Sequence, residues 1–138
     1  MKITFIFCVY NEYNNLKKNL KKTENAILER ISNFEIILID NNSNDGSSQF
    51  IHNYASSNMV KIFNKFNMGK GGSTKKAFTI AKGDYLVLHD IDGEYNINDT
   101  LDCLNFLISG KNDAIIGTRI SKRKYIYFKN YLGAIYLS

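Results

Sequence analysis

The chain has 138 residues, of which 44% are hydrophobic and 22% are charged, and this composition excludes an intrinsically disordered chain and suits one folded domain rather than two. Basic residues exceed acidic residues by five, which favours an anionic partner such as a nucleotide, a nucleic acid or an acidic lipid surface. The chain has two cysteines outside any Cys-x-x-Cys pair, no secretory signal pattern and no apolar run of membrane length, and these features together predict a cytosolic protein.

Apolar runs and amphipathic segments alternate along most of the chain. The apolar runs predict buried strands at residues 2–10, 34–40, 59–63, 84–90 and 113–117. Helices are predicted between them, with Asn11 or Asn14 as the cap of the first, near residues 16–31, 50–54, 77–81 and 96–109. Strands that alternate with helices predict an α/β fold with a mostly parallel central sheet. We assign residues 1–120 to this core and residues 121–138 to a basic, aromatic C-terminal segment.

The strand predicted at residues 84–90 ends in a group of carboxylates. Asp90, Asp92 and Glu94 follow its apolar residues at alternate positions. Parallel strands present their carboxyl ends at one edge of the sheet, where open α/β sheets bind their ligands. Carboxylate oxygens suit Mg²⁺ or Mn²⁺, which often take a few carboxylates together with substrate phosphates. The alternative is an acidic loop that ends the strand in water, since a short Asp-x-Asp motif often occurs by chance.

A glycine-rich stretch at residues 67–73 is predicted at the same edge. It has neither the Walker A spacing nor the Gly-x-Gly-x-x-Gly fingerprint. Glycines ahead of a helix still let backbone N–H groups approach an anion, and Lys70 adds a positive charge. A tight turn is the alternative interpretation of these glycines. Asp40 and Glu12 have comparable alternatives, as a turn residue and as a solvated acid at a helix start.

Several short motifs follow one another in an order that is typical of one enzyme family. The first is Cys8-Val9-Tyr10-Asn11-Glu12, where the family has proline at the first position. The second is residues 37–47, which are similar to a strand ending in Asp-Asp-x-Ser-x-Asp-Gly-Thr. The others are Asn67-Met68-Gly69-Lys70-Gly71-Gly72, Ala81-Lys82-Gly83-Asp84, Asp90-Ile91-Asp92-Gly93-Glu94-Tyr95 and Gly117-Thr118-Arg119. Together they resemble the family 2 glycosyltransferases of the GT-A fold, a three-layer α/β/α fold, which transfer a sugar from a nucleoside diphosphate sugar. The polyprenyl-phosphate (dolichyl-phosphate) sugar synthases are the most similar members.

The resemblance implies a role for each of these residues. Asp90 and Asp92 are the expected catalytic residues, and with Glu94 they are the expected ligands of Mg²⁺ or Mn²⁺. The implied reaction moves a sugar from a UDP- or GDP-linked donor to a polyprenyl phosphate or a glycan, with inversion of the anomeric carbon. A phosphate acceptor needs no general base, and no carboxylate follows Arg119. The residues expected to contact the nucleotide sugar are Cys8, Tyr10, Glu12, Asp40, Asn67, Gly69, Lys70, Gly71, Asp90, Ile91, Asp92 and Arg119.

Other functions stay open at the level of the sequence. Residues 121–138 are interpreted as the start of a truncated acceptor region, because the chain stops soon after the nucleotide-binding half of such enzymes. A non-catalytic nucleotide-sugar-binding domain is therefore one alternative, and a basic nucleic-acid-binding domain is a more remote one. The C-terminal segment either packs on the domain's own core or contacts the inner face of an anionic membrane as a peripheral anchor. His89 is expected to be packed rather than a ligand, and Cys8 and Cys103 to be buried thiols.

Overall fold

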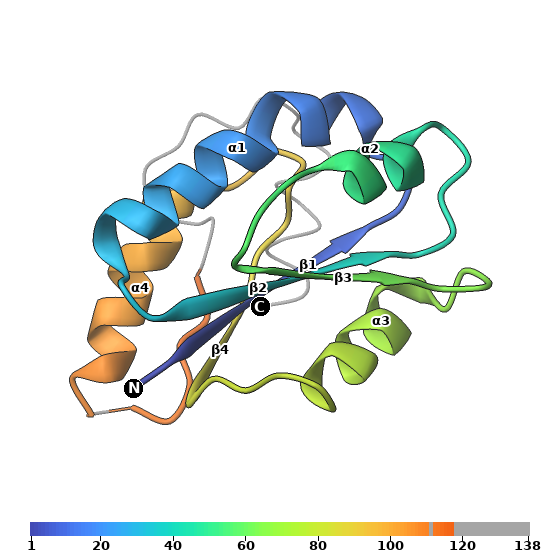
Figure 1. Cartoon of the computed structure of the whole chain (residues 1–138). Coiled ribbons are helices and arrows are strands. Elements are labelled where there is room, and N and C mark those ends of the chain that lie inside the picture. Colours follow the sequence, from blue (N-terminus) through green and yellow to red (C-terminus); the bar gives the residue numbers. More distant parts are fainter. Residues whose placement is uncertain (111, 118–138) are drawn as a thin grey trace, which may run out of the picture.

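The computed structural model describes residues 1–110 and 112–117. Its strands are β1 (Ile3–Val9), β2 (Phe34–Asp40), β3 (Met59–Phe63) and β4 (Tyr85–Leu88), and they form one sheet in the order β3-β2-β1-β4 with parallel pairings. The helices are α1 (Tyr13–Arg30), α2 (Ser47–Asn53), α3 (Gly69–Phe78) and α4 (Ile97–Ile108), arranged as Figure 1 shows. None of these described helices is long and apolar enough to cross a membrane.

The sheet lies between two layers of helices. Helices α1, α2 and α4 cover one face, and α3 covers the other (Figure 1). Alternate residues of β1 point to opposite faces, so that Phe5 and Phe7 enter the larger core while Ile6 packs under α3. Strands β1 and β2 are buried almost throughout because nearly all of their side chains are apolar. The prediction of a three-layer α/β/α fold with a mostly parallel central sheet is confirmed.

Two predictions of secondary structure were wrong: the strand at residues 113–117 and the cap of the first helix. The apolar run at residues 113–117 forms no strand, and Ile116 is 91% exposed. An apolar run becomes a strand only where a neighbouring strand offers its backbone groups, and none of the described strands pairs with this run. Helix α1 starts at Tyr13, so Asn14 lies inside it, and the position before the helix is Glu12 rather than Asn11. The residues that replace the predicted caps belong to the site described below.

A hydrogen-bonded cluster around Glu35 joins three segments at the amino edge of the sheet. Its buried carboxylate accepts hydrogen bonds from Lys2 Nζ (2.7 Å), Thr4 Oγ1 (2.8 Å) and the Lys82 backbone N–H (2.7 Å). The next backbone N–H, that of Gly83, donates to Thr4 Oγ1 at 2.9 Å. The Ala-x-Gly-Asp motif at residues 81–84 therefore joins the start of β4 to β1 and β2, at the edge opposite the predicted ligand site.

A second buried acid, Glu24, ties α1 to the segment that precedes β3. It is 3% exposed, and its carboxylate accepts hydrogen bonds from Tyr54 Oη at 2.6 Å and Ser56 Oγ at 2.5 Å. Burial acts to raise the pKa of Glu24, but these two hydrogen bonds and the charge of Lys21 outweigh burial and lower it. The ionised form of Glu24 is therefore the one that the fold stabilises.

Glu24→Gln is expected to lower the free energy of unfolding near neutral pH by about 1–3 kcal/mol, because the amide has one acceptor oxygen where the carboxylate has two, each accepting a hydroxyl hydrogen bond. The native pKa lies below the ordinary value of 4.5. The contribution of Glu24 is thus complete above that value and is lost as the pH falls through the native pKa. Urea unfolding over a descending pH series should show a shallower loss of stability for Glu24→Gln than for wild type. Exposed Glu29→Gln is the control, and parallel curves for wild type and Glu24→Gln would contradict the assignment.

Candidate functional site

The carboxyl ends of the strands meet at one edge of the sheet, and most of the predicted site residues lie there. Tyr10 follows β1, Asp40 ends β2, and Asp90 follows β4 by two residues. The parallel register sets Val9 opposite Asp40, and the His89 backbone N–H donates to the Ile6 carbonyl at 3.2 Å. Strand pairing alone therefore brings together residues that are far apart in the sequence.

The loops after β1 and β2 are held together by hydrogen bonds between them. The backbone N–H groups of Asn11, Glu12 and Tyr13 each donate at 2.9 Å to side chains of the second loop. The acceptors are Ser43 Oγ, Ser47 Oγ and Asp45 Oδ2, respectively. Burial acts to raise the pKa of Asp45, but hydrogen bonds from Ser47 and the Tyr13 backbone outweigh it and lower the pKa. Residues 43–47 therefore supply the caps of α1 that the local sequence does not provide.

Four of the residues expected to contact the nucleotide sugar lie at or near the ends of β1 and β2, and their surroundings differ. Asp40 is 2% exposed, and its carboxylate accepts the Ser43 N–H at 3.3 Å. Tyr10 is 47% exposed and presents its ring at the surface of the edge. The Glu12 carboxylate accepts a hydrogen bond from the Asn15 side chain in the first turn of α1. Cys8 is half-buried rather than buried, and burial raises the pKa of its thiol.

A network of side-chain amides fixes the glycine-rich stretch to the ends of β2 and β3. Asn41 is 4% exposed; its Nδ2 donates to Asn67 Oδ1 at 2.6 Å, and its Oδ1 accepts the Met68 N–H at 2.9 Å. Asn64 Nδ2 donates both to Asn41 Oδ1 and to Ser73 Oγ, each at 3.1 Å. Asn67 was predicted from the sequence, whereas Asn41, Asn64 and Ser73 were missed, although Asn41 adjoins Asp40 in the polar cluster after β2 and so gave a weak signal.

The glycines themselves lie in a helix and not in a loop. Helix α3 begins at Gly69, whose φ of +70° is one that glycine adopts without strain. The Gly69 N–H donates to Asn67 Oδ1 at 2.8 Å, and Gly71 is exposed with open space where a side chain would project. The prediction that all of residues 67–73 form a glycine-rich loop was therefore wrong from Gly69 onward, because the amide network fixes the start of α3 at that residue.

Lys70 and Asp90 form an ion pair across the edge. Lys70 Nζ lies 2.7 Å from both carboxylate oxygens of Asp90. The Lys70 side chain is 63% exposed and that of Asp90 30% exposed, so solvent screens much of the attraction within the pair. The structure thus brings the predicted phosphate-binding lysine into contact with the first predicted metal ligand.

The residues that follow Asp90 form a tight turn. Asp92 Oδ1 accepts the Glu94 backbone N–H at 2.9 Å, and Gly93 has a φ of +83°. The Asn19 side chain donates to the Ile91 carbonyl at 2.9 Å. Ile91 is 3% exposed and belongs to the core, so its side chain does not lie on the surface where a nucleotide sugar was expected to contact it.

His89 is packed, as predicted. Its ring lies edge-on to Phe7 with the centroids 5.8 Å apart, and its Nδ1 lies 3.0 Å from Thr100 Oγ1. Burial lowers the pKa of His89 despite the opposing charges of Asp90 and Asp92. A neutral imidazole in the core is therefore the form that the fold favours.

The carboxylates suit a divalent cation in their chemistry and their position. Within residues 1–110 and 112–117, no three His, Cys, Asp or Glu side chains are gathered as a ready-made metal site, so Asp90, Asp92 and Glu94 do not form one ligand set here. Mg²⁺ commonly takes only one or two protein carboxylates and completes its coordination with water and substrate phosphates. Asp90 and Asp92 at an open edge meet that requirement. Arg119 lies outside the described residues.

A cleft of about 440 Å³ opens beside Asp90, between α1, α4 and the loop after β4. Polar side chains from all three segments line it, including Asn19, Lys22, Glu94 and Asn96. The edge therefore has an accessible space next to its carboxylates.

Comparison with known proteins finds relatives over most of the chain. The family model for glycosyl transferase family 2 matches residues 4–134. The chain is 32% identical over 129 residues to the cholesterol galactosyltransferase of Borreliella burgdorferi, covering 92% of this chain and 34% of that protein. It is 32% identical over 93 residues to the undecaprenyl-phosphate 4-deoxy-4-formamido-L-arabinose transferase of Aeromonas hydrophila, covering 65% of this chain and 28% of that protein. The chain thus spans about a third of the length of these curated relatives.

Solved structures share the arrangement of the sheet and helices. The mannosyltransferase PcManGT from Pyrobaculum calidifontis, solved with GDP-Man and Mn²⁺, has a TM-score of 0.69 at 20% identity, covering 96% of this chain and 38% of that one. Residues 1–349 of S. aureus TarS give a TM-score of 0.67 at 22% identity, covering 92% of this chain and 39% of that one. At these identities the likeness shows the fold alone.

Proposed function

Because the chain belongs to glycosyl transferase family 2, we propose that the carboxyl edge of its sheet binds a nucleoside diphosphate sugar and serves sugar transfer to a polyprenyl phosphate or a glycan. The observation that carries the proposal is the convergence at that edge of Asp40 from the end of β2, Lys70 from the first turn of α3 and Asp90 from the loop after β4. A base and ribose, a diphosphate and a cation would each find there a group of suitable chemistry.

The donor's nucleoside is assigned to the ends of β1 and β2. Asp40 is buried at the end of its strand, and within residues 1–110 and 112–117 its carboxylate accepts only long hydrogen bonds, from the Ser43 N–H, so it retains the capacity to accept from base or ribose donors. Tyr10 is exposed and follows Val9, the residue opposite Asp40 in the sheet, so its ring offers a flat surface at this edge, and Cys8 and Glu12 lie two positions before and after it in the chain. The GDP-Man complex of PcManGT and a UDP-GlcNAc complex of TarS support a nucleotide sugar as the ligand class.

The diphosphate is assigned to the start of α3 and the loop after β4. The first N–H groups of a helix attract anions. Asn67 lies just before α3 and accepts the Gly69 N–H, and Gly71 belongs to the first turn. Lys70 adds a positive charge in the same turn. Asp90 and Asp92 would hold Mg²⁺ or Mn²⁺, with Glu94 and Arg119 as further contributors to the site. Such a cation would offset the negative charge that builds on the departing nucleoside diphosphate. The Mn²⁺ in the PcManGT structure supports this choice of cofactor.

The acceptor is assigned by the chemistry of the site. A phosphate oxygen of a polyprenyl phosphate is already anionic, so it can attack the anomeric carbon without a general base while the bond to the diphosphate breaks on the opposite face. That geometry inverts the anomeric carbon. The named activity of the undecaprenyl-phosphate transferase of Aeromonas hydrophila supports a lipid phosphate. The protein would then work in the cytoplasm at the inner face of a membrane, with residues 121–138 beginning the acceptor region.

Transfer of radiolabel from UDP-glucose or GDP-mannose into an organic phase that contains undecaprenyl phosphate, in the presence of Mn²⁺, tests the proposal. Label should enter the lipid product with wild type, and Asp92→Asn should abolish the transfer. A parallel arm with a soluble glycan tests the other acceptor class. Donor binding without any transfer in either arm would favour a nucleotide-sugar-binding domain without catalysis.

A further inference from the structure

The ion pair of Lys70 and Asp90 joins two residues that the proposed function assigns to different partners. Lys70 lies in the first turn of α3, on one face of the sheet, and Asp90 follows β4. The contact is bidentate, with both Asp90 oxygens 2.7 Å from Nζ. In the structure as it stands, the carboxylate expected to bind a cation is therefore neutralised by an ammonium group.

Lys70 and a divalent cation cannot both contact the Asp90 carboxylate without repelling each other. A divalent cation on the Asp90 oxygens would lie within a few ångströms of the Lys70 ammonium, and like charges at such distances repel strongly. A diphosphate bound near Lys70 would be repelled by the Asp90 carboxylate unless a cation neutralised that carboxylate. The cation alone therefore meets the positive charge of Lys70, and the diphosphate alone meets the negative charge of Asp90. When both ligands bind, each of these charges has an opposite charge beside it.

The local structure leaves Lys70 free to change partners. Its side chain is 63% exposed, and Gly69 and Gly71 on either side have nothing within 4 Å of where a Cβ would lie. The pair is too exposed to contribute much to stability, so opening it costs little. Lys76 on the same helix differs, because its Nζ donates to Asn64 Oδ1 at 2.7 Å and is held in the amide network.

We propose that Lys70 is a positioning residue that exchanges partners. When a divalent cation binds Asp90, Lys70 leaves Asp90 and contacts the diphosphate instead. The inference rests on the proposed function and adds a coupling to it: cation and nucleoside diphosphate each bind more tightly in the presence of the other. Because coupling between two ligands is reciprocal, the same factor acts on both affinities. Lys70 thereby keeps Asp90 neutralised in the free protein and prevents an unproductive cation complex.

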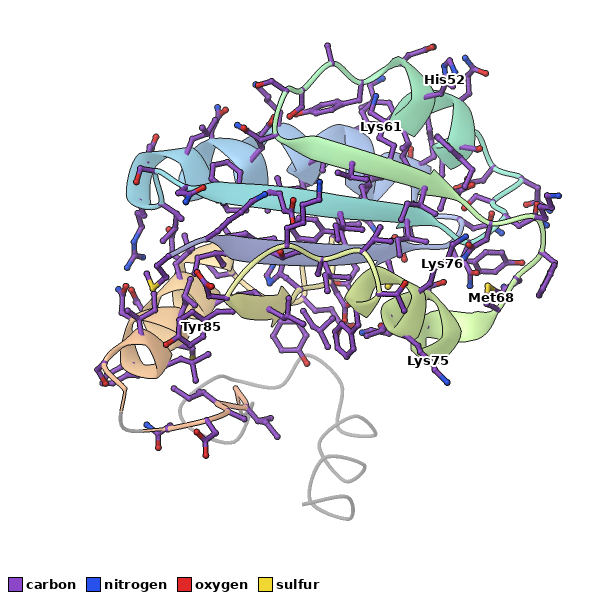
Figure 2. All side chains as sticks on the ribbon, turned by 60° about the horizontal axis from the view of Figure 1, so that its bottom comes forward. His52, Lys61, Met68, Lys75, Lys76 and Tyr85 are labelled. Atoms are coloured by element: carbon purple, nitrogen blue, oxygen red, sulfur yellow. The ribbon has the colours of Figure 1, made fainter. Side chains whose placement is uncertain are left out.

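The test measures Mn²⁺ binding by electron paramagnetic resonance without nucleotide, and UDP and GDP binding by calorimetry with saturating Mn²⁺. In Lys70→Met, Mn²⁺ alone should bind about fivefold tighter or more, while the nucleoside diphosphate should bind at least about fivefold more weakly. Lys75→Met removes an equal charge from α3, from a side chain that points away from the molecule (Figure 2), and should change neither affinity. The gain in Mn²⁺ affinity should also disappear when Lys70→Met is combined with Asp90→Asn.

The outcomes separate this inference from the function on which it rests. Nucleotide binding by wild type together with an unchanged Mn²⁺ affinity in Lys70→Met overturns the exchange and leaves the donor site intact. A gain of equal size in Lys75→Met, or one that persists with Asp90→Asn, also overturns it, because the effect would then be one of net charge. If wild type binds neither UDP nor GDP with Mn²⁺, the proposed function and the exchange fail together.

Discussion

Asp90→Asn is expected to weaken the binding of a nucleoside diphosphate in the presence of Mn²⁺ by at least about 100-fold. Even the groups that only orient metal ligands commonly contribute 10–100-fold to metal affinity, so loss of a direct carboxylate ligand should reach about the upper end of that range. The substitution keeps the shape of the side chain and removes an ion pair that is partly exposed, so the fold should remain stable. Calorimetric titration with UDP and GDP at saturating Mn²⁺ measures the effect.

The control for this prediction is Glu29→Gln, which removes one negative charge from an exposed position near the end of α1. It should bind the nucleotide as wild type does. If Asp90→Asn kept the wild-type affinity with Mn²⁺ present, Asp90 would not be a metal ligand.

Gly83→Ala is expected to lower the free energy of unfolding by about 3 kcal/mol or more, which is the upper end for overpacked sites. A Cβ at this position would lie 2.5 Å from the Thr4 backbone nitrogen, 2.6 Å from Thr4 Oγ1 and 2.9 Å from the Tyr85 carbonyl oxygen. Two of these atoms are backbone, so β1 and β4 would have to separate, and the hydrogen bond from the Gly83 N–H to Thr4 would be lost. Thermal unfolding should show a midpoint about 10 °C below that of wild type.

Gly71→Ala is the matched control, because nothing lies within 4 Å of the Cβ that it would introduce and the residue is helical. Its stability should equal or exceed that of wild type by up to about 1 kcal/mol. A Gly83→Ala variant as stable as wild type would show that β1 and β4 are not in this close contact.

Hydrophobic patterning predicted the fold correctly because long-range order here follows from local pattern. The continuous apolar runs that became β1 and β2 could be buried only between two layers of helices. Parallel pairing then placed Asp40 and Asp90 at one edge without any further information. The implied GT-A fold is confirmed by structures that match nearly the whole chain.

The remaining features depend on contacts between distant residues, which local pattern does not reveal. The N–H groups at the start of α1 are capped by Ser43, Asp45 and Ser47, more than 30 positions away. The burial of Asn41 depends on how α3 docks on the sheet. A polar residue in a turn cluster looks alike in sequence whether it is solvated or forms a buried network.

The family motifs also include positions whose side chains serve the fold itself. The Ala-x-Gly-Asp stretch lies in the family pattern, yet Gly83 serves the contact between β1 and β4 at the other edge. Ile91 lies between two aspartates of the acidic motif, yet its side chain fills the core. In both cases steric surroundings that only the folded chain provides decide the role of the residue.

The central claim is that the carboxyl edge of the sheet is a cation-dependent site for a nucleoside diphosphate. Titration of wild type with UDP-glucose and with GDP-mannose, once with Mn²⁺ and once with EDTA, tests it most directly. Saturable binding of at least one donor with Mn²⁺, lost or strongly weakened in EDTA, is the predicted result. Equal binding in EDTA would contradict the cation's role, and no binding of either donor under both conditions would contradict the donor site itself.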